Sequence, residues 1–178
     1  MDKYDGISEE NLTSEHLEKL QEFQCSDEEQ VEVFLKEEAY NLMERNLVRT
    51  RLFFDKNQNL IGFYSLFNDT IKMSKKKREA MEIRLPDSVK DIPAIRLHYI
   101  GVDSRFRKNG YGLYLMASAF YHCNIISKIS GCSLITLEST KKARTFYEKF
   151  DFIYICPSSC NQYDLMAYPT KSLFEAFD

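Results

Sequence analysis

The chain has 178 residues, of which 44% are hydrophobic and 29% charged, and its formal net charge is −3. This length and composition are typical of a soluble globular protein with one domain, which we expect to span residues 1–178. They exclude a membrane-spanning chain, because no apolar run approaches the ~18–20 residues that cross a bilayer, and the net negative charge argues against electrostatic nucleic-acid binding by the whole chain.

The cysteines and histidines do not form a metal-binding pattern. The five cysteines include no Cys-x-x-Cys pair, and the three histidines are widely separated. An odd number of cysteines also argues against a disulfide scaffold, so we expect free thiols and no metal. The acidic, polar start of the chain, MDKYDGISEENLTSEH, is unlike a secretory signal, and we therefore expect a cytoplasmic protein.

The first part of the chain predicts two helices and a hairpin. A short helix is expected over Ser14–Phe23. Ser26 followed by Glu29 is typical of a capping box, and apolar residues at helical spacing continue behind it to about Arg45. Two runs rich in β-forming residues then flank the polar turn Asp55–Asn59, which is a strong hairpin signal.

The run KMSKKKRE, Lys72–Glu79, concentrates positive charge in an otherwise acidic chain. We interpret it as a solvated loop, with a binding patch as the alternative. Proline residues then interrupt the chain, and strands and helices alternate behind them. The later elements expected are a strand over Ala94–Val102, a helix over Tyr111–Ile126, a strand over Ser133–Ser139, a helix over Thr140–Phe150, strands at 152–155 and 162–168, and a short helix over Lys171–Phe177.

The order of these elements predicts the fold class. Helices come first, then an antiparallel hairpin, then a strand–helix–strand–helix–strand succession. This order is typical of an α/β sandwich, in which a mixed sheet carries helices on both faces.

The stretch RFRKNGYG, Arg105–Gly112, places three cations and two glycines just before a predicted helix. Each exposed cation there is unfavourable by roughly 0.3–1 kcal/mol, because the helix dipole is positive at that end. Gly110 and Gly112 let the backbone turn sharply, and N–H groups at a helix start bind anions. The stretch predicts a phosphate-bearing ligand. A tight turn with solvated charges is the alternative, since G-x-G alone is a weak signal.

Two motifs resemble those of a known family. YIGVDSRFRKNGYGLYLM resembles motif A of the GNAT acyltransferases, an apolar strand followed by [RQ]-x-x-G-x-[GA] and a helix, and ITLESTKKARTFYEKFDF resembles motif B. In the first half, FQCSDEEQVEVFLKEEA and GFYSLFND are similar to the branch that contains aminoacyl-tRNA-acetylating toxins. The resemblance implies a GNAT-like α/β fold with a mixed, mostly antiparallel sheet of about six or seven strands and helices on both faces.

The resemblance also implies acetyl-CoA as cosubstrate and assigns residues to it. The backbone N–H groups that would hold its pyrophosphate are those of Arg107, Lys108, Asn109, Gly110, Tyr111 and Gly112. The residues that would bind or enclose its pantetheine arm are Ile100, Gly101, Val102, Ser139, Thr140 and Phe146. The cofactor anion would then offset the cations of the loop.

The chain departs from the family pattern at two positions. Thr140 stands where relatives commonly carry Asn near the pantetheine, and its hydroxyl offers fewer hydrogen bonds. Asp151 stands where a Gly usually follows the last helix. Asp tolerates the left-handed conformation better than most residues, so we expect the turn to survive.

For catalysis, the resemblance favours Tyr147 as the acid that protonates the leaving thiolate. Transfer from an ordinary tyrosine (pKa ~10) to a thiolate (pKa ~8.5) is uphill by about 2 kcal/mol, which is workable. Main-chain N–H groups near 100–102 would polarise the carbonyl. The alternative for Tyr147 is a core residue, because Ala143, Phe146 and Phe150 share its helical spacing.

His98 is the candidate general base. It lies two residues before Ile100 on the predicted strand, and imidazole titrates near neutral pH. The alternative is a packed strand histidine, and an acceptor amine of low pKa, such as that of an aminoacyl ester, needs no base.

Three functions follow from the sequence. The first is an acetyl-CoA-dependent N-acetyltransferase that moves an acetyl group to a primary amine by direct attack. The second is a toxin that acetylates aminoacyl-tRNA, with the cations of Lys72–Glu79 on the RNA backbone. The third is a catalytically silent acyl-CoA-binding module. We expect a small-molecule or macromolecular amine acceptor, tRNA among the candidates, and no membrane; a homodimer and an antitoxin partner stay open.

Overall fold

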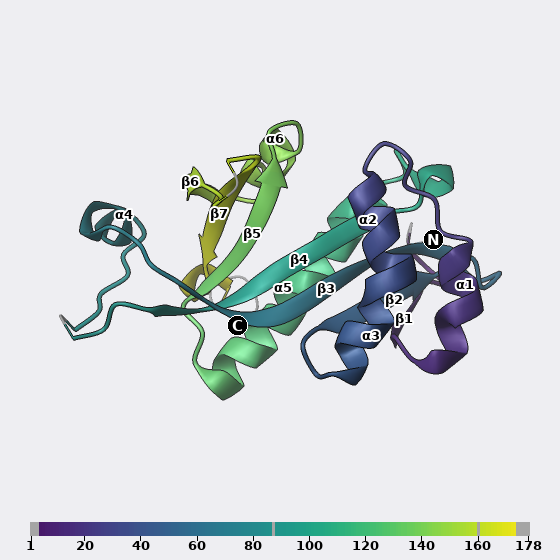
Figure 1. Cartoon of the computed structure of the whole chain (residues 1–178), viewed down its shortest axis with the longest axis horizontal. Coiled ribbons are helices and arrows are strands. Elements are labelled where there is room, and N and C mark those ends of the chain that lie inside the picture. The colour runs from purple at the N-terminus through teal and green to yellow at the C-terminus, as the bar shows by residue number, and fades with distance from the viewer. Residues whose placement is uncertain (1–3, 87, 160, 174–178) are drawn as a thin grey trace. The chain divides into compact units, whose positions relative to one another are not determined.

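The computed structural model describes residues 4–86, 88–159 and 161–173 (Figure 1). The strands of this part of the chain form one seven-stranded sheet in the order β1-β2-β3-β4-β5-β7-β6. β4 and β5 pair in parallel, whereas β1 with β2, β2 with β3, β5 with β7 and β6 with β7 pair antiparallel. The predicted mixed, mostly antiparallel sheet is confirmed.

The strands are β1 Ser8–Asn11, β2 Arg49–Phe54, β3 Leu60–Ile71, β4 Ile92–Val102, β5 Leu134–Thr140, β6 Ile153–Pro157 and β7 Tyr163–Pro169. The α-helices are α1 Leu17–Gln21, α2 Glu29–Val33, α3 Ala39–Glu44, α4 Lys75–Ala80, α5 Tyr111–Ser130 and α6 Arg144–Glu148. Single 3-10 turns cover Ser14–His16 and Ser104–Phe106, and a π-helical segment, Phe34–Glu38, joins α2 to α3. None of the helices in the described residues is long and apolar enough to cross a membrane.

The contacts divide the chain into two compact units. The first contains the residues up to Phe67 together with His98–Ala119, and the second contains Asn68–Leu97 together with the residues from Phe120 onward. β3, β4 and α5 therefore each contribute residues to both units. The single domain over residues 1–178 stays a prediction.

In the first unit, neighbouring side chains of β3 point to opposite faces of the sheet. The Phe63 ring packs on Phe23 and Phe34, with centroids 5.5 and 6.1 Å apart. The Tyr64 hydroxyl instead lies 3.1 Å from Oγ of Ser118 on α5. α1, α2 and α3 thus cover one face, and α5 covers the other (Figure 1), which confirms helices on both faces for this unit.

The second unit has its own core. Its fully or nearly fully buried side chains come from the end of β3, the residue after α4, the start of β4, and from β5, β6 and β7. They are Ile71, Met81, Ile92, Ala94, Leu134, Ile155 and Ala167. On α5, the Phe120 ring stacks on Tyr168 at 4.9 Å and on Phe152 at 5.9 Å. This packing holds β7 and the residue before β6 against the second half of α5.

The predicted capping box at Ser26 and Glu29 is wrong. α2 begins at Glu29, its N-cap position is Glu28, and no side chain caps it. Ser26 therefore lies too far from the first turn to cap it. Glu32 stabilises the helix start instead, because its carboxylate accepts from the Cys25 backbone N–H at 2.7 Å and from Lys36 Nζ at 2.6 Å.

One other expectation differs from the structure, one strand was not expected, and one expected helix lies largely outside the described residues. The predicted basic loop contains the short helix α4, which Ser74 caps by accepting from the Lys77 backbone N–H at 3.4 Å. β1 was not predicted, because its sequence SEEN is short and polar and its pairing to β2 is not local. The predicted helix Lys171–Phe177 lies largely outside the described residues, which end at 173.

Gly62 gives the fold a testable constraint. A Cβ at this position would lie 2.5 Å from the Gly101 carbonyl oxygen and 3.3 Å from the Val102 Cα, both on β4. We expect Gly62→Ala to lower the free energy of unfolding by about 1–3 kcal/mol, because the strands must separate to admit the methyl group. Urea denaturation measures this, with Ser130→Ala at an exposed position as the control, for which a change within about 0.5 kcal/mol is expected. Equal effects of the two substitutions would contradict the close approach.

Candidate functional site

The glycine loop between β4 and α5 has the backbone form of an anion-binding site. Lys108 and Gly110 both adopt left-handed conformations, with φ of +62° and +78°. Outside the helices of the described residues, no backbone N–H of 107–110 donates a hydrogen bond. Tyr111 and Gly112 open α5, and the first N–H groups of a helix have no partner within it. Successive free amides in such turns, next to a helix N-terminus, bind phosphate oxygens. The loop therefore fits a diphosphate.

A buried carboxylate fixes the start of this loop. Asp103 follows β4 directly, and its side chain is 0% exposed. Its Oδ1 accepts from the Arg105 backbone N–H and Nε at 2.8 and 2.9 Å, and its Oδ2 accepts from the Arg105 guanidinium and the Gln24 backbone N–H, each at 2.9 Å. The Ser104 backbone N–H in turn donates to the Gln24 carbonyl at 2.8 Å. Asp103 thus ties the loop to the connector between α1 and α2, residues 22–28.

Arg107 makes a second tie to the same connector. Its guanidinium pairs with the Asp27 carboxylate and lies 3.0 Å from the Cys25 sulfur. Its Nε donates to the Val102 carbonyl at 3.2 Å. The long side chain of Arg107 therefore turns back from the loop toward the end of β4. Arg107 contributes only its backbone N–H to the row of free amides.

The expectation is that the cofactor anion offsets the loop cations, but the chain itself already offsets two of them. Arg105 and Arg107 each pair with a carboxylate of the chain itself, Asp103 and Asp27. Lys108 is exposed and forms no ion pair among the described residues. A bound phosphate would therefore meet one uncompensated side-chain charge and the backbone amides.

The pKa values follow from the same contacts. Burial works to raise the pKa of Asp103, but the hydrogen bonds from Arg105 and from the Gln24 backbone outweigh it and hold the pKa below its usual value. The pKa of Arg107 is raised, chiefly by its hydrogen bond to Asp27. Burial raises the pKa of the Cys25 thiol, although Arg107 opposes this, so Cys25 is a neutral packing residue.

The end of β4 is packed where the resemblance places the pantetheine arm. A Cβ on Gly101 would lie 2.5 Å from Val31 Cγ1 and 3.2 Å from the Phe63 ring, so only glycine fits under α2. Ile100 and Val102 are half-buried. The Val102 carbonyl already accepts from Arg107, which reduces what it can offer to a ligand.

In the second unit, the end of β5 builds the start of α6. Ser139 is 1% exposed and donates to the Thr140 carbonyl at 2.7 Å. The Thr140 hydroxyl accepts from the Ala143 backbone N–H at 3.2 Å. Both hydroxyls therefore shape the turn into α6, and the Thr140 hydroxyl is committed to that turn.

α6 presents the tyrosine that the resemblance favours as an acid. Tyr147 is half-buried, and its ring lies 5.2 Å from Phe146 and 6.0 Å from Phe152. Asp151 lies in the turn after α6 with φ of +62°, and the Phe152 backbone N–H donates to the Tyr147 carbonyl at 3.3 Å. The expected left-handed turn at Asp151 is confirmed. The catalytic role of Tyr147 stays a prediction.

His98 lies among aromatic rings in the first unit. Its ring is 5.1 Å from Phe34, 5.1 Å from Phe67 and 4.5 Å from Tyr99, with all three interplanar angles above 60°. It is half-buried on β4. These edge contacts suit the packed alternative, and the base role stays a prediction.

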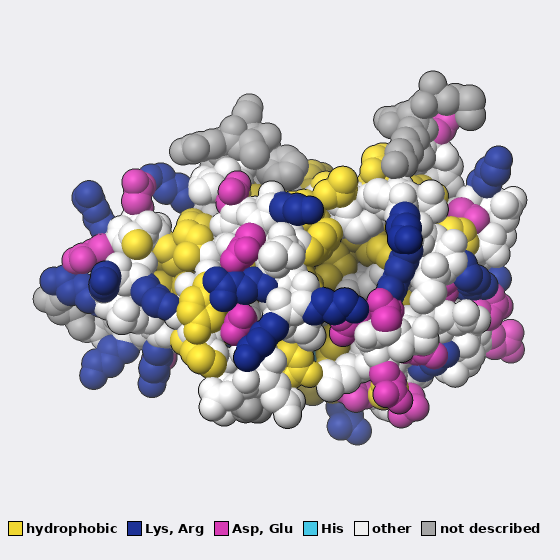
Figure 2. Space-filling model, turned by 90° about the horizontal axis from the view of Figure 1, so that it is seen from above, with side chains coloured by type: hydrophobic (Ala, Val, Ile, Leu, Met, Phe, Trp, Pro, Cys, Tyr) yellow, Lys and Arg dark blue, Asp and Glu magenta, His cyan; other side chains and the backbone are white. Residues whose placement is uncertain are grey.

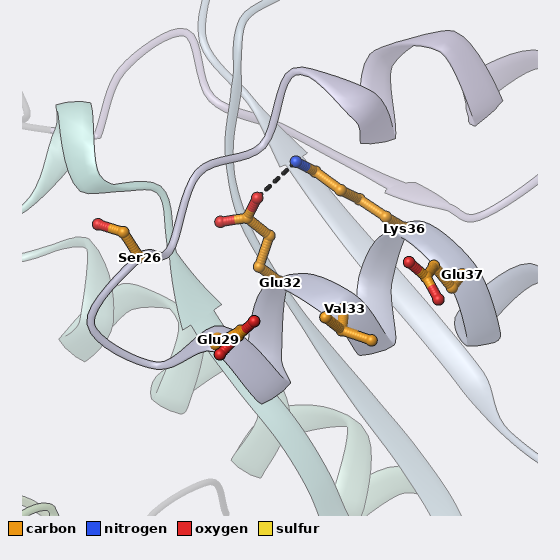
Figure 3. Close-up of a pocket in the computed structure, with 6 residues that line it drawn as sticks. All are labelled: Ser26, Glu29, Glu32, Val33, Lys36 and Glu37. Atoms are coloured by element: carbon orange, nitrogen blue, oxygen red, sulfur yellow. Dashed lines mark hydrogen bonds and ion pairs between the residues drawn. The ribbon is translucent and has the colours of Figure 1, made fainter.

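An open pocket of about 360 Å³ lies on the helix that follows the connector (Figure 3). Its lining residues are Ser26, Glu29, Glu32, Val33, Lys36 and Glu37. Figure 3 shows Glu32 turned toward Lys36, with which it forms an ion pair at 2.6 Å. None of the residues predicted for the cofactor lines this pocket.

Sequence reasoning did not identify the residues that shape the loop. Asp27 and Gln24 lie about 80 positions before their partners, and no local pattern indicates such a pairing. Asp103 could have been found, because a carboxylate two residues before Arg105, directly after an apolar strand, is a short-range ion-pair pattern.

Residues 49–154 match the family model of the acetyltransferase (GNAT) domain, which covers more than half of the chain. Among proteins with curated descriptions, none matches the chain in sequence.

Solved structures resemble the chain over nearly its whole length. A tyrosine-to-phenylalanine variant of KacT has a TM-score of 0.82 at 22% identity and covers 97% of this chain and 100% of its own. AtaT complexed with acetyl-methionyl-tRNAfMet has a TM-score of 0.79 at 24% identity and covers 97% and 99%. A tyrosine-to-phenylalanine variant of the AtaT toxin, bound to acetyl-CoA and the C-terminus of the antitoxin AtaR, has a TM-score of 0.75 at 23% identity and covers 97% and 99%.

We expect Asp103→Asn to destabilise the protein at pH 7 by about 1.5–3 kcal/mol or more, because charge-assisted hydrogen bonds in a buried site are lost. The folded-state pKa of Asp103 is lowered, so its contribution is present above the unfolded pKa of about 3.9 and is lost as pH falls through the folded value. The difference from wild type should therefore shrink in acid.

Urea unfolding from pH 7 down to pH 3 measures this difference. Asp91→Asn is the matched control, because Asp91 is 59% exposed and its ion pair with Lys72 spans 3.9 Å. A constant difference across this pH range for Asp103→Asn would contradict the assignment.

Proposed function

Because the chain belongs to the GNAT acetyltransferases, which use acetyl-CoA, we propose that it transfers an acetyl group to a primary amine by direct attack on the thioester. The observation that carries the proposal is the row of free backbone N–H groups over 107–112, with Lys108 and Gly110 in left-handed conformations. This row of amides fits the diphosphate of the donor, because no acceptor atom of the loop occupies these N–H groups.

Direct attack needs little from the protein beyond positioning and proton transfer. The amine lone pair forms the new C–N bond, the C–S bond breaks, and the thiolate takes a proton from the Tyr147 hydroxyl. The proton lost by the amine goes to water or to His98. The tyrosinate then takes up a proton from solvent, which regenerates the Tyr147 hydroxyl. An α-amino group has a pKa near 8, so a useful fraction is already neutral at pH 7. His98 is therefore the candidate base, but the reaction does not depend on it.

We further propose that the acceptor is the amino group of an aminoacyl-tRNA. Support comes from the likeness to AtaT in complex with acetyl-methionyl-tRNAfMet, which extends over 97% of this chain. A small-molecule amine is the second candidate. The antitoxin-bound AtaT variant makes an antitoxin a candidate partner of this chain as well, and a homodimer stays a prediction.

Product mass spectrometry separates these acceptors. The chain and acetyl-CoA are incubated with aminoacyl-tRNA, polyamines, lysine and peptide N-termini. We expect an added acetyl group on the aminoacyl ester. Acetylation of a polyamine or of lysine alone would assign a small amine instead. Acetyl-CoA binding without any acetylated product would identify a silent binding module and contradict the proposed function.

Tyr147→Phe tests the acid. A positioned general acid contributes typically 10²–10⁴-fold, so we expect kcat to fall by at least about 100-fold while the Kd for acetyl-CoA changes by less than about twofold. Tyr40→Phe on α3 is the matched control, because Tyr40 is half-buried and packs against the core of the first unit. Turnover of Tyr147→Phe equal to that of the control would leave Tyr147 as a packing residue.

A further inference from the structure

The segment 72–84 concentrates positive charge in the second unit. It contains six lysines and arginines and two glutamates, a net charge of +4, whereas the whole chain carries −3. The rest of the chain therefore carries −7. Figure 2 shows Lys and Arg side chains gathered around α4, at the left of the view. We call residues 72–84 the basic segment.

The basic segment is a fixed part of the structure. Ser74 caps the start of α4, and Glu82 ends it in a left-handed conformation, φ +55°, with the Ile83 backbone N–H donating to the Arg78 carbonyl at 2.9 Å. Met73 and Met81 on either side of α4 pack on the core of the second unit. The charges are therefore presented on an anchored helix.

Several of these cations are available to a partner. Lys72 and Lys75 are 78% and 82% exposed, and their ion pairs with Asp91 and Glu79 span 3.9 Å. Such exposed pairs contribute little, about 0–1 kcal/mol. Lys76 is exposed and forms no ion pair among the described residues.

A cation–π cluster joins α4 to β6 and α6 of the second unit. Lys77 Nζ lies 5.0 Å from the centroid of the Tyr154 ring on β6, and the Arg144 guanidinium carbon of α6 lies 4.6 Å from the same centroid. Arg144 is also paired with Glu148 at 2.8 Å. Lys77 thus holds α4 against the second unit, whereas the charges of Lys72, Lys75 and Lys76 are exposed to solvent.

The apolar residues of the basic segment identify the kind of partner. Met73, Met81 and Ile83 all pack against the core of the second unit, and none of them is an exposed hydrophobic side chain. A protein partner usually buries aromatic or aliphatic anchors at the centre of an interface, and a membrane surface takes up an exposed apolar face. The basic segment offers neither. It offers lysine charges, which suit a phosphate backbone.

We propose that the basic segment binds the phosphate backbone of RNA, independently of base sequence. The inference rests on the proposed function, since it assigns the contact that an aminoacyl-tRNA acceptor makes outside the reacting end. Lys72, Lys75 and Lys76 each pair with a phosphate oxygen and release a counterion. Lys77 is a positioning residue that acts through Tyr154.

The test compares two triple variants of equal charge. One is Lys72→Ala/Lys75→Ala/Lys76→Ala. The control is Lys19→Ala/Lys56→Ala/Lys128→Ala, which removes three lysines from α1, the β2–β3 turn and α5. Fluorescence anisotropy measures the Kd for uncharged tRNA and for an unrelated RNA hairpin between about 50 and 200 mM KCl. Calorimetry with acetyl-CoA checks that each variant keeps its fold and donor site.

For wild type we expect similar affinity for both RNAs and a steep loss of binding with salt. Each phosphate contact contributes about −0.7 to −0.9 to the slope of log K against log[salt]. The slope of the first variant should therefore be less steep than that of wild type by about 2–3, and its affinity at low salt should be at least about tenfold weaker. The control should lose less than about threefold.

Equal losses in the two variants would overturn the inference, because net charge alone would then explain binding. An equal dependence on the basic segment in binding to polyglutamate or to phosphatidylserine vesicles would also overturn it. Failure of the proposed function is distinguishable. In that case no amine is acetylated, while the salt slope still depends on Lys72, Lys75 and Lys76.

Discussion

The buried carboxylate of Asp103 holds the end of β4, the glycine loop and the α1–α2 connector in one arrangement. It accepts from the backbone N–H groups of Arg105 and Gln24 and from the Arg105 guanidinium, and its side chain is 0% exposed. Removing water from a carboxylate is unfavourable unless several donors replace it. Because those donors come from both segments, the loop keeps its shape before any ligand arrives, and binding loses less conformational entropy.

In the glycine loop, the charged side chains and the groups proposed to bind the ligand are different. Arg105 and Arg107 lie in the glycine loop, but their guanidinium groups are satisfied by Asp103 and Asp27. In the proposed function, the ligand is bound instead by the backbone, through the free amides that follow and the left-handed residues Lys108 and Gly110. A similar separation occurs in the basic segment, where Lys77 packs on Tyr154, while its exposed neighbours form only long, exposed ion pairs or none among the described residues and are available to a partner.

Much of this could be predicted from the sequence wherever the determining pattern is local. The hairpin turn is an example, since the Asp55 carboxylate accepts from the Asn57 and Asn59 backbone N–H groups at 2.8 and 2.9 Å. The strand–glycine–helix succession around Gly110 is another. Patterns that depend on distant residues could not be predicted. Asp27 meets Arg107 across 80 positions, and β1 exists because Glu9 and its neighbours pair with β2.

The central claim is that free amides of the glycine loop bind the diphosphate of acetyl-CoA. Isothermal titration calorimetry of the wild-type chain with acetyl-CoA and with S-acetylpantetheine, which lacks the diphosphate, tests it most directly. We expect saturable binding of one acetyl-CoA per chain and at least about 100-fold weaker binding of S-acetylpantetheine, a difference of about 2.7 kcal/mol. Equal affinities, or a folded protein that gives no saturable heat with acetyl-CoA, would contradict the claim.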